Sequence, residues 1–326
     1  MKNFLYYFLI AIIFISIGWF LNVAYHLPKS PNNPIAEIRP TPLYKYSIEN
    51  LSKTEFKASD IEIGRLIKDY PKFSSYEFFF TVDSKRVSGL INIPKGNGVY
   101  PLVVMFRGYV DQKQYIIGTG TQHAGEVFAN NGYITVAPDF LGYGSSDLES
   151  SNIFESRFQT YITAVTAIKS VKTIKQWDQK NIFIWGHSNG GQVALTTLEI
   201  TGAVYPTVLW APVSKPFPFS ILFYTDESDD HGKFIRQELA KFEQDYDVEK
   251  FSLTNYLDKI KAPIQLHQGT ADDAIPVAWS DLLAKILKKQ GLEINYIKHF
   301  GASHDMTPGW DRVAQTSLEF FEKNIK

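Results

Sequence analysis

The chain has 326 residues, enough for one large α/β domain with appendages or for two small domains. Its 44% hydrophobic and 21% charged residues are typical of a folded globular protein and exclude an intrinsically disordered one. A formal net charge of -1 gives no basis for nucleic-acid binding, and the lack of cysteine excludes disulfides, a thiol nucleophile and cysteine metal sites.

The first feature along the chain is an uncharged apolar run from Phe4 to Ala24. At about 1.5 Å per residue, a helix of this length spans roughly 32 Å, which matches a hydrocarbon core of about 30 Å. A cleavable signal peptide is the alternative, but the run is long for one and Asn22-Val23-Ala24 is a poor cleavage site. We therefore expect residues 1–26 to be a transmembrane signal anchor, with the following domain outside the cytoplasm.

Residues 27–72 are expected to connect this anchor to the main domain. Proline recurs between Leu27 and Pro42, and such a composition predicts an extended, semi-rigid spacer. The mixed polar and apolar residues from Leu43 to Tyr70 suggest one or two short helices that lead into the domain.

Residues 73–326 alternate between strand and helix patterns. The segments Ser75–Val82 and Arg86–Ile93 are rich in β-branched and aromatic residues and predict an antiparallel hairpin at the edge of a sheet. Further strands are expected at Leu102–Phe106, Tyr133–Ala137, Ile182–Trp185, Thr207–Trp210, Ile264–Gln268 and Ile294–Lys298, and helices at Ala124–Asn130, Tyr161–Gln176, Trp279–Gln290 and Trp310–Asn324. This alternation predicts an α/β fold whose mostly parallel central sheet has helices on both faces.

The segment Lys215–Asp258 interrupts the alternation. It contains a helical pattern at Lys233–Tyr246, and it is either an insertion over the active face or a long surface excursion. As an insertion, it would place an apolar wall beside the site, formed by Pro216, Phe217, Pro218, Phe219 and Phe223.

The pentapeptide Gly186-His187-Ser188-Asn189-Gly190 fits the pattern G-x-S-x-G between an apolar strand and a helical pattern. A serine on such a sharp strand-to-helix turn is strained and presents its hydroxyl to solvent. Glycines are needed on either side because a side chain there would block the close approach of strand and helix. An ordinary serine in a tight turn is the alternative, but the placement favours Ser188 as a nucleophile.

A serine nucleophile needs a base to take its proton and an acid to orient that base. On a strand-turn-helix serine, these follow in the order Asp or Glu, then His. Asp272 and Asp273 lie in the loop after one expected strand, and the pattern alone does not choose between them. His304 lies in the loop after the next strand and is preferred as base over His267 and His299, which fall within or at the end of strands.

Negative charge on the reacting oxygen requires two backbone N–H donors. The expected donors are Asn189, at the positive end of its helix, and Tyr109, in the loop after Leu102–Phe106. The Tyr109 ring would serve either as a further donor or as a pocket wall. The sequence contains no H-E-x-x-H pattern, no histidine cluster and no glycine-rich phosphate loop, so we expect neither a metal nor a cofactor.

Four segments of the chain resemble the catalytic domain of the prolyl oligopeptidase family of α/β-hydrolases. They read DFLGYGSSD at 139–147, WGHSNGG at 185–191, GTADDAIP at 269–276 and GASH at 301–304. The resemblance covers about residues 73–326 and implies that Asp272, the first aspartate of its pair, is the acid of a Ser-Asp-His triad. The chain departs from the common pattern at Arg107, where many hydrolases have histidine, and at Leu141, which replaces a common arginine.

The resemblance implies a serine hydrolase, but the short stretch before residue 73 leaves no room for the family's N-terminal β-propeller. Because the propeller restricts substrates to short peptides, its absence leaves both peptides and esters possible. The first hypothesis is therefore a membrane-anchored hydrolase of the peptidase kind, and the second is a membrane-tethered carboxylesterase. A non-catalytic binding module is the third, and the presence of Ser188, Asp272 and His304 argues against it. The expected partners are a small ester or short peptide and the membrane, whereas the oligomeric state is not indicated.

Overall fold

The computed structural model describes residues 40–225 and 228–326. The expected anchor at residues 1–26 and most of the proline-rich spacer lie outside the described residues. Within the described part, no helix is both long enough and apolar enough to cross a bilayer.

Thr41–Lys326 forms one compact unit, so the domain begins well before the expected boundary at residue 73. Two short helices are present near its start, the 3-10 helix η1 (Pro42–Tyr46) and α2 (Ile48–Lys53), as expected. A strand that the sequence did not predict follows, β1 (Glu62–Asp69). Every residue of β1 is exposed, so it lacks the alternation of apolar and polar residues that identifies a half-buried strand.

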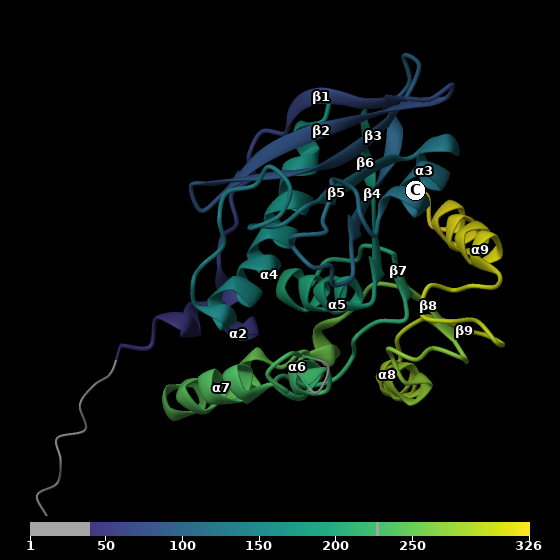
Figure 1. The fold of residues 1–326 in the computed structure, drawn as a ribbon. Coiled ribbons are helices and arrows are strands. Elements are labelled where there is room, and N and C mark those ends of the chain that lie inside the picture. The colour runs from purple at the N-terminus through teal and green to yellow at the C-terminus, as the bar shows by residue number, and fades with distance from the viewer. Residues whose placement is uncertain (1–39, 226–227) are drawn as a thin grey trace, which may run out of the picture. The chain divides into compact units, whose positions relative to one another are not determined.

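A single nine-stranded sheet runs through the unit in the order β1-β2-β3-β5-β4-β6-β7-β8-β9 (Figure 1). The remaining strands are β2 (Phe73–Val82), β3 (Lys85–Pro94), β4 (Tyr100–Phe106), β5 (Ile134–Pro138), β6 (Trp177–His187), β7 (Thr207–Trp210), β8 (Ile264–Gly269) and β9 (Ile294–His299). The pairs β1/β2, β2/β3 and β3/β5 are antiparallel, and the pairs from β5 to β9 are parallel. The mostly parallel sheet is confirmed, and the predicted hairpin is β2 and β3, although β1 and not the hairpin forms the sheet edge.

Helices cover both faces of this sheet, as predicted. One face packs against α4 (Ile153–Ser170) and α5 (Asn189–Thr201), and the other against α3 (Gln122–Asn130) and α9 (Trp310–Lys323). In Figure 1, α3 and α9 lie together on the side away from α4. The helix α8 (Val277–Lys289) packs against β8 and β9.

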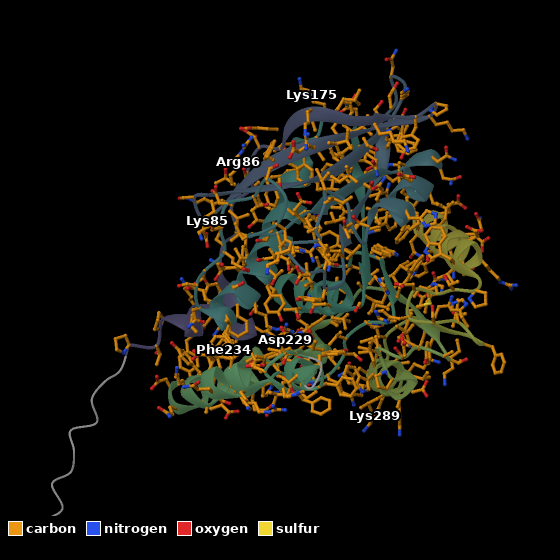
Figure 2. All side chains as sticks on the ribbon, viewed as in Figure 1. Lys85, Arg86, Lys175, Asp229, Phe234 and Lys289 are labelled. Carbon is orange, nitrogen blue, oxygen red and sulfur yellow. The ribbon has the colours of Figure 1, made fainter. Side chains whose placement is uncertain are left out.

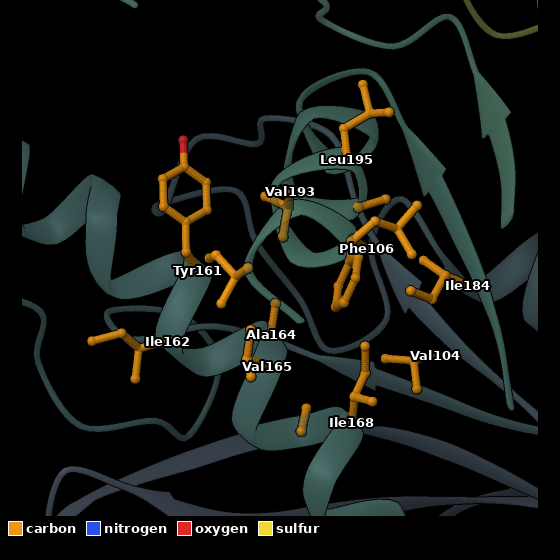
Figure 3. Close-up of a cluster of buried hydrophobic side chains, with 14 of the residues drawn as sticks. Val104, Phe106, Tyr161, Ile162, Ala164, Val165, Ile168, Ile184, Val193 and Leu195 are labelled. Atoms are coloured by element: carbon orange, nitrogen blue, oxygen red, sulfur yellow. The ribbon is translucent and has the colours of Figure 1, made fainter. Parts of the chain in front are cut away.

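The core between the sheet and α4 and α5 holds α5 in place. Val104 of β4 and Ile184 of β6 are fully buried there, with Ala164 and Val165 of α4 and Leu195 of α5 around them (Figure 3). Each fully buried valine, leucine or isoleucine stabilises the fold by roughly 1.5–3 kcal/mol when it leaves water, and this burial holds α5 against β6.

Lys175 and Lys289 are exposed and point away from the body of the molecule (Figure 2).

The helix α4 differs from its predicted bounds of Tyr161–Gln176. It starts earlier because Asn152 caps it: the Asn152 carbonyl Oδ1 accepts the backbone N–H of Phe154 and of Glu155, each at 3.0 Å. It also ends earlier, at Ser170, where a short 3-10 turn begins. An asparagine cap followed by a glutamate three residues later is a start signal that periodicity alone overlooks.

The segment Lys215–Asp258 connects β7 to β8 and carries α6 (Phe219–Leu222) and α7 (Lys233–Asp245). The predicted helix at 233–246 is therefore confirmed. Part of the segment belongs to the core and not to the surface: Phe217 is only 2% exposed and packs edge-on against Phe154 of α4.

Candidate active site

Ser188 lies at the junction between β6, which ends at His187, and α5, which begins at Asn189. Its backbone has φ 56° and ψ −122°, a conformation that a residue with a side chain adopts only under strain. Two hydrogen bonds hold it there: the Ser188 N–H donates to Trp210 O at 2.9 Å, and the Val213 N–H donates to Ser188 O at 3.0 Å. The sheet and the chain after β7 therefore fix the turn on which the serine sits.

Glycine is required beside Ser188 because β6 and α5 approach closely. A Cβ atom on Gly186 would lie 2.6 Å from Gly190 O, and one on Gly190 would lie 1.9 Å from Phe106 O. Both distances are below any normal contact, and the obstructing atoms are backbone. The glycines of the G-x-S-x-G pattern therefore have the steric role that the sequence predicted.

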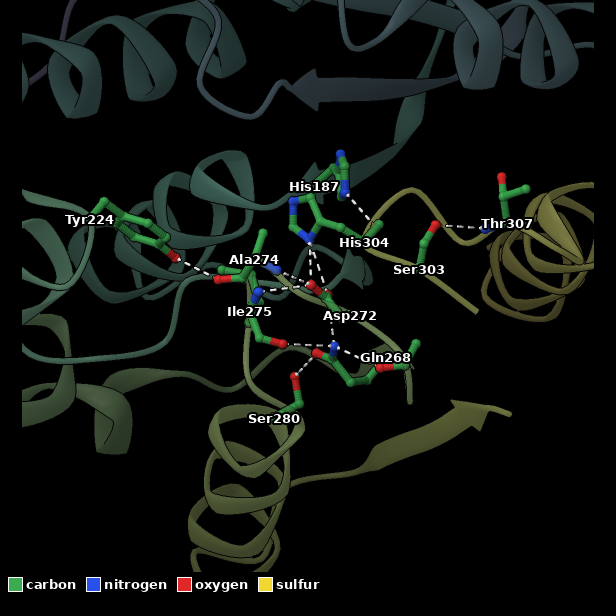
Figure 4. A network of polar contacts seen from close by, with 11 residues as sticks. His187, Tyr224, Gln268, Asp272, Ala274, Ile275, Ser280, Ser303, His304 and Thr307 are labelled. Atoms are coloured by element: carbon green, nitrogen blue, oxygen red, sulfur yellow. Dashed lines mark hydrogen bonds and ion pairs between the residues drawn. The ribbon is translucent and has the colours of Figure 1, made fainter. Parts of the chain in front are cut away.

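Asp272 and His304 come together at the carboxyl ends of β8 and β9. The His304 imidazole Nδ1 lies 3.0 Å from Asp272 Oδ2 and 3.1 Å from Oδ1 (Figure 4). The Asp272 carboxylate is fully buried, whereas the His304 side chain is 18% exposed. The backbone links the two loops as well, because the Ala271 N–H donates to Ala302 O at 2.9 Å.

Further donors hold the Asp272 carboxylate in its loop. Oδ1 accepts the N–H groups of Ala274 and Ile275 at 2.9 and 2.7 Å, and Oδ2 accepts Gln268 Nε2 at 2.8 Å. Gln268 is itself oriented by Ser280, whose hydroxyl donates to Gln268 Oε1 at 2.6 Å. Burial by itself would raise the pKa of Asp272, but the hydrogen bonds from His304, Ile275 and Gln268 lower the pKa below its usual value. The carboxylate is therefore ionised whenever His304 needs an acceptor.

The neighbouring Asp273 is exposed, and only Asp272 of the two aspartates contacts His304. The contact thus involves the aspartate that the family resemblance implied, and not its neighbour. Gln268 is a site residue that the sequence analysis did not name. Its position at the buried end of a strand, four residues before the acid, is the only sequence signal that could have indicated it.

His187, next to the serine, is a second residue that supports the site. Its Nε2 lies 3.1 Å from the backbone O of His304, and the two imidazole centroids are 4.7 Å apart (Figure 4). Burial, with a smaller contribution from the nearby His304, lowers the pKa of His187 to about 4. A neutral imidazole therefore supports the loop of His304 without competing with it for a proton.

His267, His299 and His123, which we do not assign as the base, contact other residues. His267 Nδ1 and His299 Nε2 are 2.8 Å apart, and His267 Nε2 contacts Gln265 Oε1 at 2.9 Å, so both ring nitrogens of His267 have partners. Burial lowers the pKa of His267 to about 3. His123 stacks on Trp310 with 3.6 Å between ring centroids. Among the described residues, no three acidic or histidine side chains are arranged to hold a metal ion.

The loop after β4 passes directly beside the serine. A Cβ on Gly108 would lie 3.1 Å from Ser188 Cβ and 3.5 Å from Ser188 Oγ. Arg107 Nη1 donates to Gly108 O at 2.9 Å. Because a trans peptide directs its N–H opposite to its C=O, the Tyr109 N–H points away from this arginine. Asn189 is the first residue of α5, so its N–H has no partner within the helix and lies at the positive end of the helix dipole.

A cavity of about 220 Å³ lies beside these two backbone groups. Its lining residues are Arg107, Tyr109, Phe140, Leu141, Tyr143, Glu149, Ile153, Ser156, Arg157, Gln159, Thr160 and Asn189. The Tyr109 ring is 78% exposed at its rim. Of the described residues that line it, none comes from Lys215–Asp258, so the expected apolar wall belongs instead to the loop after β5 and to α4.

The aromatic residues of Lys215–Asp258 pack in places other than this cavity. Phe217 is in the core, and Phe219 and Phe223, 44% and 43% exposed, pack against Trp279 of α8. This exposed aromatic group adjoins the loop of Asp272, because the Tyr224 hydroxyl donates to Ala274 O at 3.3 Å.

The aspartates flanking Gly142-Tyr143-Gly144 hold their loop against β3, as turn residues do. Asp139 is fully buried: Oδ2 accepts the Ser88 hydroxyl at 2.6 Å and Oδ1 accepts the Tyr115 hydroxyl at 2.5 Å. Burial raises the pKa of Asp139. Asp147 Oδ2 accepts the Arg86 N–H at 2.7 Å.

A mostly parallel sheet, a serine on a strained turn after a central strand, and an aspartate–histidine pair after the last two strands define an α/β-hydrolase. Residues 120–326 match the family model of the prolyl oligopeptidase family. The chain therefore belongs to that family and is a serine hydrolase, either a peptidase or an esterase. The described residues form one sheet and contain no propeller.

Solved structures of both kinds of enzyme have the same fold. The acetyl xylan esterase from Paenibacillus sp. R4 is 18% identical, with a TM-score of 0.63 over 85% of this chain and 92% of that one. The acylaminoacyl peptidase of Pyrococcus horikoshii is 19% identical, with a TM-score of 0.60 over 80% of this chain and 44% of that one. No curated protein matches the chain in sequence. At these identities the likeness concerns the fold and does not transfer a substrate.

Proposed function

We propose that this protein hydrolyses small acyl esters through an acyl-enzyme on Ser188, with His304 as base, Asp272 as the acid that orients it, and Tyr109 and Asn189 as oxyanion donors. The observation that carries the proposal is the contact of His304 Nδ1 with the buried Asp272 carboxylate at 3.0 Å, on the same edge of the sheet as the strained Ser188. The strained backbone of Ser188 and the buried charge of Asp272 each cost folding free energy. Their presence together is typical of a catalytic site.

The contacts assign a role to each group. With its Nδ1–H donated to Asp272, His304 presents an unprotonated Nε2 that can take the proton of Ser188 Oγ. Oγ attacks the acyl carbon, and the N–H groups of Tyr109 and Asn189 stabilise the oxyanion. The tetrahedral intermediate collapses as the alcohol leaves with the proton from His304. Water then attacks the acyl-enzyme by the same route, and the acid product and Ser188 are released.

The cavity beside the oxyanion donors supports small substrates. Its volume of about 220 Å³ holds a short acyl chain and not an extended peptide. Esters also have the better leaving group, so we propose esterase activity as the main function and slow cleavage of small peptides as a secondary one. A peptidase function is the alternative, which membership of a family that includes peptidases supports.

We also propose that the protein is anchored in a membrane by residues 1–26, with the catalytic domain outside the cytoplasm. The uncharged run Phe4–Ala24 and the proline-rich spacer after it support this placement. Proteinase added to intact cells is expected to cleave within the spacer and release an active fragment. A domain that is protected until the membrane is permeabilised would indicate the reverse orientation.

The substrate class is tested by a direct comparison of nitrophenyl acetate with nitroanilides of one- and two-residue peptides. We expect kcat/KM for the ester to exceed that for the amides, and both activities to be lost in Ser188→Ala. Rapid amide hydrolysis without ester turnover would favour the peptidase alternative. An absence of both activities in the full chain would contradict the proposal.

A further inference from the structure

The cavity beside Ser188 contains two arginine side chains, Arg107 from the end of β4 and Arg157 from α4. Arg107 is only 6% exposed, and Arg157 is half-buried. Among the described residues, no carboxylate oxygen lies within 4.0 Å of a nitrogen of either guanidinium. Arg107 attracts the buried Asp139 carboxylate, whereas no ion pair joins Arg157 to a carboxylate among the described residues. A cation that lines a cavity without an ion-pair partner favours an anionic ligand, because burying an unpaired charge is costly.

The two guanidinium groups differ in how many hydrogen bonds and ring contacts they already make. Arg107 donates from Nη1 to Gly108 O at 2.9 Å and from Nη2 to Asp139 O at 3.1 Å, and it lies 3.9 Å from the centroid of the Tyr143 ring. Backbone carbonyls and an aromatic face therefore stabilise its charge, and only its buried Nε lacks a partner.

Arg157 also lines the cavity and is held by neighbouring side chains. Its Nη2 donates to Gln192 Oε1 at 2.8 Å, and Gln192 Nε2 donates to the Tyr161 hydroxyl at 3.1 Å. This chain ties the guanidinium to the first turn of α5, the helix that starts immediately after Ser188. The Nε of Arg157 is buried without a partner. Arg157 is thus a fixed cation beside the nucleophile, and an additional acceptor would complete its hydrogen bonds.

One carboxylate does line the same cavity, that of Glu149. Its oxygens are already engaged by other donors: Oε1 accepts Gln112 Nε2 at 2.7 Å, and Oε2 accepts the Ser156 hydroxyl. Glu149 therefore does not form an ion pair with either arginine.

We propose that the acyl group bound in this cavity carries a carboxylate that pairs with Arg157, so that the substrates are monoesters of short dicarboxylic acids. A guanidinium matches a carboxylate because its planar fork can donate two parallel hydrogen bonds. The proposal rests on the proposed esterase function: Ser188 Oγ displaces the alcohol, and water releases the dicarboxylic acid from the acyl-enzyme. Arg107 adds positive potential, whereas Arg157 makes the direct contact.

The test compares two aryl esters that differ only in the terminal group of the acyl chain, the nitrophenyl monoester of glutaric acid and nitrophenyl pentanoate. We expect wild type to hydrolyse the glutarate monoester with the higher kcat/KM. In Arg157→Gln this preference should fall at least tenfold, because KM rises for the glutarate monoester far more than for pentanoate. Arg157→Lys should retain part of the preference. The control is Lys113→Gln, which removes an exposed cation on the same loop as Tyr109 but outside the cavity, and should leave the preference intact.

A wild-type enzyme that prefers pentanoate would overturn this inference and leave the esterase proposal standing. The same conclusion would follow if Lys113→Gln lowered the preference as much as Arg157→Gln, because the effect would then be long-range attraction. Binding provides a test that does not depend on turnover: glutarate should bind saturably to Ser188→Ala in calorimetry and bind more weakly when Arg157→Gln is added. Equal or absent glutarate binding in both proteins would contradict the arginine site, whereas loss of all ester turnover with binding retained would contradict only the catalytic proposal.

Discussion

The Nδ1 atom of His304 lies 3.0 Å from Oδ2 of Asp272, although the two residues are 32 positions apart in the chain. The parallel pairing of β8 with β9 produces this proximity, because the loops that carry the two residues leave the sheet at the same edge. An imidazole held in this way has one tautomer and one orientation. The contact therefore holds the His304 imidazole in place relative to Asp272 before any substrate binds.

Asp272→Asn should reduce kcat by about 10⁴-fold, because an amide in place of the carboxylate favours the wrong tautomer of His304. Asp273→Asn is the matched control: it makes the same chemical change at the adjacent exposed residue and should leave kcat within a factor of a few. Steady-state hydrolysis of nitrophenyl acetate measures both. Equal losses in the two variants would mean that the acid has been wrongly assigned.

His304→Ala should also lower kcat by about 10⁴-fold, because it removes the group that takes the serine proton. His299→Ala removes an imidazole that contacts His267 at 2.8 Å, so it should reduce stability and leave kcat nearly unchanged. Rates measured at a temperature where both variants are folded separate the two effects. A base role for His304 would be untenable if its alanine variant kept most of the wild-type rate.

Much of the fold follows from local patterns, because the buried parallel strands are short apolar runs and the covering helices are amphipathic. β7 and β8 match their predicted segments closely for this reason. β1 was not predictable, since an edge strand exposed on both faces shows no periodicity. The burial of Phe217 in the core could not be predicted either. An aromatic residue in a proline-rich loop has the same sequence pattern whether its side chain is packed or exposed.

The residues of the candidate site also differ in how far the sequence could predict them. Ser188 and His304 could be located because the turn after a central strand and the loop after the last strand each have a sequence signal. The choice of Asp272 over Asp273 needed the family resemblance, since two adjacent aspartates in one loop have equal local chemistry. Gln268 and Arg157 act through contacts with residues distant in sequence, and no motif marks such contacts.

Gly190→Ala should lower the free energy of unfolding by about 1–3 kcal/mol and strongly reduce activity, because the added Cβ would lie 1.9 Å from Phe106 O. Relief of that clash must move β4 or the turn of Ser188. Gly98→Ala is the control, since its Cβ would meet only ordinary contacts with Tyr100 at 3.4 Å and beyond. Urea unfolding gives the stability of both, and a wild-type stability for Gly190→Ala would contradict the tight packing around the turn of Ser188.

Glu199→Gln should stabilise the protein increasingly as the pH rises. Glu199 in α5 is 1% exposed and neither oxygen has a hydrogen-bond partner, and burial raises its pKa well above the usual 4.5. Above pH 4.5 the unfolded chain releases this proton and the folded chain keeps it, so wild-type stability falls by about 1.4 kcal/mol per pH unit until the folded pKa is reached.

The glutamine variant lacks this proton and therefore this decline. The difference in unfolding free energy between variant and wild type should be small near pH 4 and should grow in favour of the variant toward pH 8. Glu243→Gln on the exposed face of α7 should show no such trend. A pH-independent difference for Glu199→Gln would show that the carboxyl is ionised in the folded protein.

The most direct test of the account is covalent labelling of the nucleophile. A fluorophosphonate probe should label the wild-type protein once per chain, at Ser188, with the modified peptide identified by mass spectrometry. Ser188→Ala should remain folded and unlabelled, and His304→Ala should label far more slowly. Stoichiometric labelling of another residue, or labelling that persists in Ser188→Ala, would contradict the assignment of Ser188 as the catalytic serine.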